Sequence, residues 1–147
     1  MVKIVVADDS QLIRKILVTL FNSEPDFEVV GEARDGFEAV NQVNRLHPDV
    51  LVLDLMMPKL NGVDVLKYIR STPALKETPV IILSNAHMTS LAQEAAAIGA
   101  ERALLKSSCT PGQLIDVIND LLSGKAVESD PSKRFAVPAL PPTKPQS

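Results

Sequence analysis

Aromatic residues, glycine and cysteine are scarce in this sequence of 147 residues. Aromatic residues make up 3% of the chain and tryptophan is absent, so a core must be built mainly from Val, Ile, Leu and Ala. The single cysteine, Cys109, rules out an internal disulfide and is typical of a reducing compartment. The six glycines form neither G-x-G-x-x-G nor G-x-x-x-x-G-K, which argues strongly against a nucleotide-binding domain.

Long apolar runs and clustered positive charge are also missing. No apolar run approaches the roughly 18 residues that span a bilayer, and Met1-Val2-Lys3 leads directly into a strand-like run instead of a signal peptide. We therefore expect a soluble, cytoplasmic protein. Residues 1–124 carry 11 Lys and Arg against 16 Asp and Glu, and residues 125–147 carry 4 against 2. Direct binding to nucleic acid is not expected, because it relies on clustered positive charge.

Short apolar strands alternate five times with amphipathic helices. The predicted strands cover residues 2–7, 27–30, 50–54, 80–83 and 103–105. A first helix is expected after Ser10 or Asp9, and others after Asp35 and Asn61 and over the region 91–98. The last is expected to begin at the capping-box sequence Thr110-Pro111-Gly112-Gln113. This alternation predicts an α/β fold, a doubly wound five-stranded parallel sheet with helices on both faces.

The predicted helices have apolar faces that we expect to be buried. The face of the first helix comprises Leu12, Ile13, Ile16, Leu17, Leu20 and Phe21, and that of the second comprises Phe37, Val40, Val43 and Leu46. The composition changes at Lys125, after which five prolines occur among polar residues. Residues 1–124 are therefore predicted to form one domain, and residues 125–147 an extended or disordered proline-rich tail.

The strand Val50–Asp54 is the most informative segment. Four consecutive apolar residues predict a strand buried on both faces, and the strand ends in a carboxylate. In a doubly wound sheet, ligands bind outside the carboxyl ends of the strands. The polar residues predicted to follow or end strands are Asp8, Asp9, Asp54, Ser84 and Lys106.

These residue types together favour phosphoryl chemistry. Three converging carboxylates repel one another, and a hard cation such as Mg²⁺ relieves that repulsion. An ammonium group and a hydroxyl group nearby would complete a pocket for a phosphoryl group, with Asp54 as a candidate nucleophile. Taken one at a time, each residue has an ordinary explanation as a helix cap or a solvated side chain.

The order and spacing of several short motifs resemble those of response regulator receiver domains. These motifs are Asp8-Asp9-Ser10, Asp54-Leu55-Met56-Met57-Pro58, Asn61-Gly62, Ser84 and Lys106. The resemblance covers residues 1 to about 124. It implies the strand order 2-1-3-4-5, which is that of flavodoxin-like folds.

The resemblance also implies a role for each site residue. Asp54 would accept a phosphoryl group from a histidine kinase, Asp9 would bind Mg²⁺ directly, and Asp8 would act mainly through water. The backbone carbonyl of Met56 would complete the metal site together with Asp54. Lys106 and Ser84 would bind the phosphoryl oxygens.

The sequence departs from the family pattern at three positions. Ala103 replaces the usual Tyr or Phe three residues before the lysine, so an aromatic readout at that position is unavailable. Ser107 replaces the usual proline after Lys106, and Asn85 replaces a smaller residue after Ser84. These departures leave the chemistry at Asp54 intact and bear on the conformational output.

A receiver of this kind would be a phosphoacceptor signalling domain, not a dedicated enzyme. Its expected partners are a histidine kinase or phosphotransfer protein and a downstream protein, with homodimerisation as a further possibility. No effector region is visible, so the chain resembles stand-alone regulators of the chemotaxis type, unless it is a fragment of a longer protein. Two other hypotheses remain open, namely a pseudo-receiver that acts by constitutive protein contact and a metal-dependent phosphatase.

Overall fold

The computed structural model of the chain describes residues 1–84, 89–106 and 110–123. The expectations for Asn85, Ser107 and the segment 125–147 concern residues outside this part. The elements in order are β1 (Val2–Ala7), α1 (Gln11–Asn22), β2 (Phe27–Ala33), α2 (Gly36–Leu46), β3 (Val50–Asp54), α3 (Gly62–Ser71), β4 (Val80–Ser84), α4 (Thr89–Ile98), β5 (Arg102–Leu105) and α5 (Pro111–Ser123).

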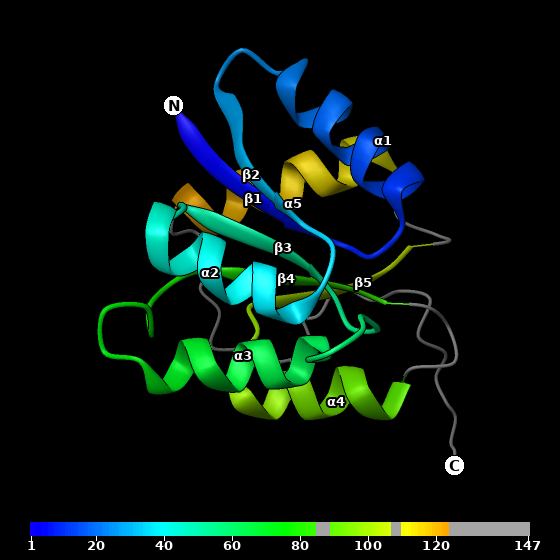
Figure 1. Ribbon diagram of the computed structural model, residues 1–147. Helices are drawn as coiled ribbons and strands as arrows, with labels where there is room; N and C mark the ends of the chain where they lie inside the picture. The colour runs from blue at the N-terminus through cyan, green and yellow to red at the C-terminus, as the bar shows by residue number, and fades with distance from the viewer. Residues whose placement is uncertain (85–88, 107–109, 124–147) are drawn as a thin grey trace.

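One parallel sheet with the strand order β2-β1-β3-β4-β5 lies between two layers of helices, which confirms the predicted fold. Figure 1 shows α1 and α5 on one face and α2, α3 and α4 on the other. Each layer has its own apolar core. Leu17 and Phe21 of α1 pack with Ile118 of α5, whereas Val43 of α2 packs with Leu66 of α3 and other residues of the opposite layer.

β3 lies at the centre of the sheet, between β1 and β4. All five of its residues are buried, as the continuous apolar run predicted. Its side chains contribute to both cores, with Val50 and Val52 facing one layer and Leu51 and Leu53 facing the other. Asp54 therefore ends a strand that water does not reach on either face.

β2 is longer than predicted. The sequence indicated an end at Val30, but the strand continues through Gly31 to Ala33. A register shift between Ile4 and Val5 leaves Val30 outside the pairing, after which Gly31 pairs with Val5. The ladder resumes beyond the irregularity because a β-bulge accommodates one extra residue without ending the strand.

Three side chains of α1 and α2 that were predicted to be buried are exposed, as is Leu122 on the predicted apolar face of α5. Leu12 and Ile16 of α1 have 67% and 52% of their surface exposed, and Phe37 of α2 has 54%. Both helices lie on the outside of the sheet, so only the part of each apolar face that points at the sheet is covered. On α1, Leu17 and Phe21 are buried, and Ile13 and Leu20 are partly buried.

Arg70 stabilises the edge of the sheet where β4 and β5 begin. Its guanidinium group donates to the backbone oxygens of Thr78 at 2.7 Å and of Gly99 at 2.8 Å. It also forms an ion pair with Glu101 at 2.9 Å. These contacts join the end of α3 to the segments that precede β4 and β5.

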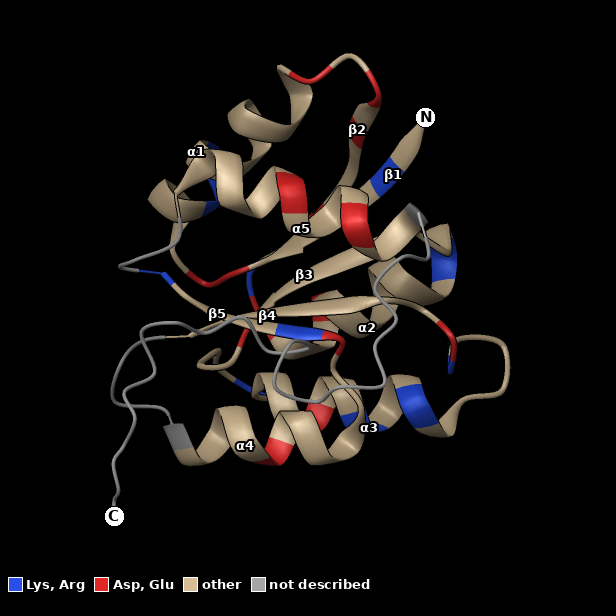
Figure 2. Cartoon of the chain, turned by 180° about the vertical axis from the view of Figure 1, so that it is seen from behind, with Lys and Arg blue, Asp and Glu red and all other residues tan. Residues whose placement is uncertain are grey.

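Charged residues are dispersed over the described part of the chain. Figure 2 shows the chain from behind, with Lys and Arg in separate short segments instead of one patch. None of the helices in this part has the length and apolar character that a membrane crossing requires.

Two glycines, Gly36 and Gly62, lie in close contact with the loop that follows β3. The Gly62 N–H donates to Leu55 O at 2.8 Å, and a Cβ at position 62 would lie 2.6 Å from Asp54 O. The Gly36 N–H lies 3.4 Å from Pro58 O, and a Cβ at position 36 would clash with the Cβ and backbone oxygen of Leu60. The beginnings of α2 and α3 can therefore approach this loop closely only because both positions lack a side chain.

The substitution Gly36→Ala tests this close approach. We expect it to lower the free energy of unfolding by about 1–3 kcal/mol, because the new methyl group must displace the backbone at Leu60. Gly112→Ala is the matched control, since nothing lies within 4 Å of a Cβ there. In the helical position of Gly112, alanine is expected to be neutral or stabilising by up to about 1 kcal/mol.

Urea unfolding followed by circular dichroism measures both changes. Equal stability of the Gly36→Ala and Gly112→Ala variants would show that the contact at Leu60 does not constrain the loop.

Candidate functional site

The carboxyl ends of four neighbouring strands meet at one edge of the sheet, at the right of Figure 1. Asp8 and Asp9 follow β1, Asp54 is the last residue of β3, and Ser84 is the last residue of β4. Lys106 follows β5, and its N–H donates to Ser84 O at 2.9 Å. The fold thus brings to one edge the residues that the sequence predicted to lie there.

Three carboxylates converge at this edge. Asp8, Asp9 and Asp54 each offer an oxygen atom, and these atoms lie within 4.8 Å of one another. Asp8 and Asp54 are buried, with 1% and 3% of their surface exposed, whereas Asp9 is exposed to solvent. The cluster is therefore open on the side of Asp9.

Lys106 provides the positive charge of the site. Its Nζ lies 2.8 Å from Asp8 Oδ2 and 3.3 Å from Asp54 Oδ1. One ammonium group thus contacts both buried carboxylates. Since the cluster holds three carboxylates and Lys106 is the cation in contact with two of them, ionisation of all three leaves the group with excess negative charge.

This excess affects the pKa of Asp54. Burial raises the pKa of this carboxyl group from 3.8 to about 6, and the negative charge of Asp8 adds to the effect. Lys106 and the Met56 N–H act in the opposite direction without cancelling it. Burial tends to lower the pKa of Lys106, but the hydrogen bond to Asp8 and the charges of Asp54 and Asp8 outweigh it and raise that pKa.

Ser84 and Met56 lie beside Asp54 in different ways. Ser84 is 3% exposed at the end of β4, next to the strand that carries Asp54. Met56 has 53% of its surface exposed, and its N–H lies 3.4 Å from Asp54 Oδ1. The roles predicted for the Ser84 hydroxyl and the Met56 carbonyl remain predictions. Ala103, at the position where an aromatic residue is usual, is buried in the core on the side of α2, α3 and α4.

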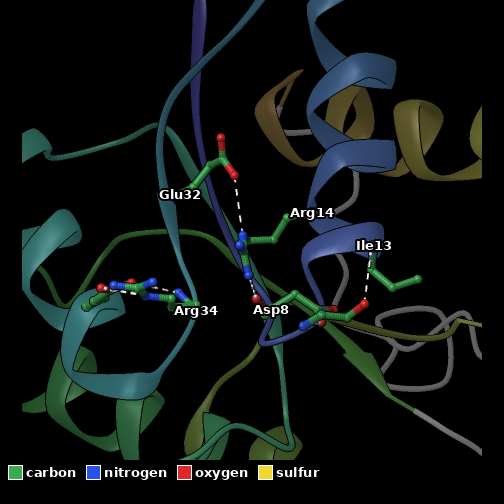
Figure 3. A network of polar contacts seen from close by, with 7 residues as sticks. Asp8, Ile13, Arg14, Glu32 and Arg34 are labelled. Carbon is green, nitrogen blue, oxygen red and sulfur yellow. Dashed lines mark hydrogen bonds and ion pairs between the residues drawn. The ribbon is translucent and has the colours of Figure 1, made fainter.

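Arg14 is a residue of this region that sequence reasoning missed. Its Nη1 donates to the backbone oxygen of Asp8 at 2.8 Å, and its Nε lies 3.3 Å from Glu32 Oε1 (Figure 3). An arginine in the first turns of an exposed helix carries no local signal that separates it from a solvated side chain. Its contact with Asp8 depends on how α1 packs over β1 and β2.

The donor set fits a divalent cation with a preference for oxygen ligands. Asp8 Oδ2 is buried and, apart from Lys106, has no hydrogen-bond partner among the described residues. Mg²⁺ is commonly bound by one or two carboxylates together with water, and the exposed Asp9 leaves room for water. Asp8, Asp9 and Asp54 are the residues that would hold the ion.

Comparison with known proteins identifies a family and several relatives that this chain resembles. Residues 4–119 match the response regulator receiver domain family. A protein-glutamate methylesterase/protein-glutamine glutaminase of Pyrococcus horikoshii is 43% identical over 95 residues, which are 65% of this chain and 24% of that protein. The chain spans less than half the length of the curated relatives that it matches, 41% in the case of a methylesterase of Symbiobacterium thermophilum.

Solved structures share both the fold and part of the sequence. The response regulator domain of Thermotoga maritima CheB matches with a TM-score of 0.76 and 32% identity, over 84% of this chain and 97% of that one. The CheX–CheY–BeF₃–Mg²⁺ complex of Borrelia burgdorferi matches with a TM-score of 0.73 and 26% identity, over 82% of this chain and 89% of that one.

The raised pKa of Asp54 predicts how stability depends on pH in metal-free protein. The folded state retains the proton up to about pH 6, whereas the unfolded state loses it near 3.8. Stability contributed by this group is therefore present below pH 3.8 and lost as the pH rises through 6. The difference between the pKa values of Asp54 in the folded and unfolded states lowers the free energy of unfolding by an amount on the order of 2–3 kcal/mol at neutral pH.

Asp54→Asn removes this titration. At pH 7.5 in EDTA, we expect the variant to be more stable than the wild type by about 1–3 kcal/mol, with the difference shrinking toward pH 4. Urea unfolding at several pH values measures it, and Asp116→Asn on the exposed side of α5 is the control. A variant that is less stable than the wild type at pH 7.5 would contradict the prediction.

Proposed function

Because this chain belongs to the response regulator receiver domain family, we propose that Asp54 accepts a phosphoryl group in a Mg²⁺-dependent reaction. The carrying observation is the position of Lys106 Nζ, within 3.3 Å of Asp54 and 2.8 Å of Asp8, beside three converging carboxylates. This arrangement offers a nucleophile, a metal site and a cation at one edge of the sheet. The donor is a phosphohistidine of a kinase or phosphotransfer protein, or a small phosphate compound.

In the proposed transfer, an oxygen of Asp54 forms a bond to phosphorus while the bond from phosphorus to the donor breaks. The products are an aspartyl phosphate and the free donor group, such as a neutral or protonated histidine. Asp54 attacks as the carboxylate, a form that the positive charges of Lys106 and of a bound Mg²⁺ would favour. Burial of the carboxylate excludes bulk water from its surroundings, which strengthens electrostatic interactions there.

The other residues of the site would hold the metal ion or contact the phosphoryl oxygens. Bound Mg²⁺ would supply positive charge to the phosphoryl oxygens, as in other phosphoryl transfers. Asp9 and Asp8 would hold the ion together with Asp54 and the Met56 carbonyl, Asp9 directly and Asp8 mainly through water. Lys106 would exchange part of its contact with Asp54 for a phosphoryl oxygen, and the Ser84 hydroxyl would donate to another.

The proposed output is a change in protein contacts, in binding to a downstream protein or in homodimerisation. Ser84 ends β4 beside β3, which ends in Asp54, so a hydroxyl that follows the phosphoryl group can change the conformation at the end of β4. With Ala103 in place of an aromatic residue, the response does not use an aromatic side chain at this position. The methylesterase and glutaminase activities belong to the whole relatives and are not assigned to this segment.

Beryllofluoride, a mimic of an aspartyl-bound phosphoryl group, tests the proposal. With Mg²⁺ present, beryllofluoride is expected to raise the melting temperature, because a ligand at 100 times its dissociation constant adds about 2.7 kcal/mol of stability. Asp54→Ala should abolish the increase, whereas the control Asp116→Ala should retain it. Thermal unfolding followed by circular dichroism measures the effect, and size-exclusion chromatography of the same samples reports any change in assembly.

Phosphorylation by acetyl phosphate gives an independent test, with mass spectrometry of the intact chain as the measurement. A wild type that neither responds to beryllofluoride nor becomes phosphorylated would favour a pseudo-receiver that acts by constitutive protein contact. An Asp54→Ala variant that responds as the wild type does would place the phosphoacceptor elsewhere.

A further inference from the structure

The peptide bond between Asp8 and Asp9 joins two of the three carboxylate-bearing residues, and Arg14 contacts it directly. Arg14 Nη1 donates to Asp8 O at 2.8 Å. We propose that Arg14 is a positioning residue for the divalent cation, which fixes this peptide so that both carboxylates point into the site. The inference rests on the proposed function, in which the acidic cluster binds Mg²⁺.

Asp8 is held by hydrogen bonds on several sides. Its N–H donates to Ala33 O at 2.9 Å, and its Oδ1 accepts from the Ser10 N–H at 2.9 Å. Its backbone oxygen accepts from Arg14. Loss of the Arg14 contact would leave a carbonyl near the buried end of β1 without this partner.

Asp9 depends on the same peptide more strongly. In the part of the chain described here, no hydrogen bond to the Asp9 carboxylate is found, and the residue is exposed. A peptide unit is planar, so fixing the oxygen of Asp8 also fixes the direction in which the chain enters Asp9. Arg14 thereby restricts the position of the carboxylate proposed to bind the ion directly.

Arg14 is itself well placed to act as a rigid support. Its backbone N–H donates to Ser10 O at 3.0 Å, in the first turn of α1. Its Nε lies 3.3 Å from Glu32 Oε1 on β2, and its side chain is 14% exposed (Figure 3). Two guanidinium nitrogens therefore contact two different segments. Lysine, with one nitrogen, would not reproduce this fork.

Arg70 is a control residue that distinguishes positioning of the ion from general stabilisation of the fold. It is also a largely buried arginine, 15% exposed, that donates to backbone oxygens and pairs with a glutamate. It lies where β4 and β5 begin, whereas the acidic cluster lies where the strands end. Substitution of Arg70 should lower stability without changing the affinity for Mg²⁺.

The experiment compares Arg14→Ala, Arg14→Lys and Glu32→Gln with Arg70→Ala and Arg70→Lys in the full chain. Isothermal titration calorimetry measures the dissociation constant for Mg²⁺, and urea unfolding measures stability. Groups that orient metal ligands contribute about 10–100-fold to affinity, so we expect a loss of that order in Arg14→Ala. Arg14→Lys and Glu32→Gln should show smaller losses, and both Arg70 variants should bind Mg²⁺ as the wild type does.

The outcomes separate the inference from the proposed function. If the wild type binds Mg²⁺ and Arg14→Ala binds it equally well, or no more weakly than Arg70→Ala, the positioning role is overturned while the metal site stands. If the wild type does not bind Mg²⁺, the proposed function and the inference fall together. Should Arg14→Ala not fold, Arg14→Lys and Glu32→Gln decide, since unchanged affinity in both would refute the role.

Discussion

The burial of Asp54 at the end of a fully covered strand is the constraint on which the site depends. A carboxylate in this position loses most of its hydration, and the neighbouring Asp8 adds repulsion, so its pKa rises to about 6. Lys106 reduces the cost by contacting both carboxylates, at 3.3 Å and 2.8 Å. A single ammonium group cannot neutralise three carboxylates. The site therefore has excess negative charge, which a divalent cation would neutralise.

The two edges of the sheet carry different kinds of interaction. At the edge where the strands end, three carboxylates and Lys106 lie close together. Gly36 and Gly62 let α2 and α3 approach the loop after Asp54 at this edge. Where β4 and β5 begin, Arg70 binds backbone oxygens and a glutamate, which joins segments without creating a site. Arg14 makes the same types of contact as Arg70, but it makes them at the edge that carries the carboxylates. The same chemistry thus has different consequences at the two edges.

The surroundings of the site limit how a modification at Asp54 could be communicated. Ala103 contributes only a buried methyl group on the strand beside β4. The backbone N–H of Lys106 donates a hydrogen bond to Ser84 O at 2.9 Å, which joins the end of β4 to the end of β5.

The alternation of apolar strands and amphipathic helices determined the fold class, and the family resemblance added the strand order. The order of strand ends was enough to predict that Asp8, Asp9, Asp54, Ser84 and Lys106 meet, because parallel strands share one carboxyl edge. Periodicity could not tell which part of an apolar helical face is covered, so Leu12, Ile16 and Phe37 were wrongly predicted to be buried. The extension of β2 and the contacts of Arg14 depend on residues distant in the sequence. Only packing between segments decided them, since neither has a local signal.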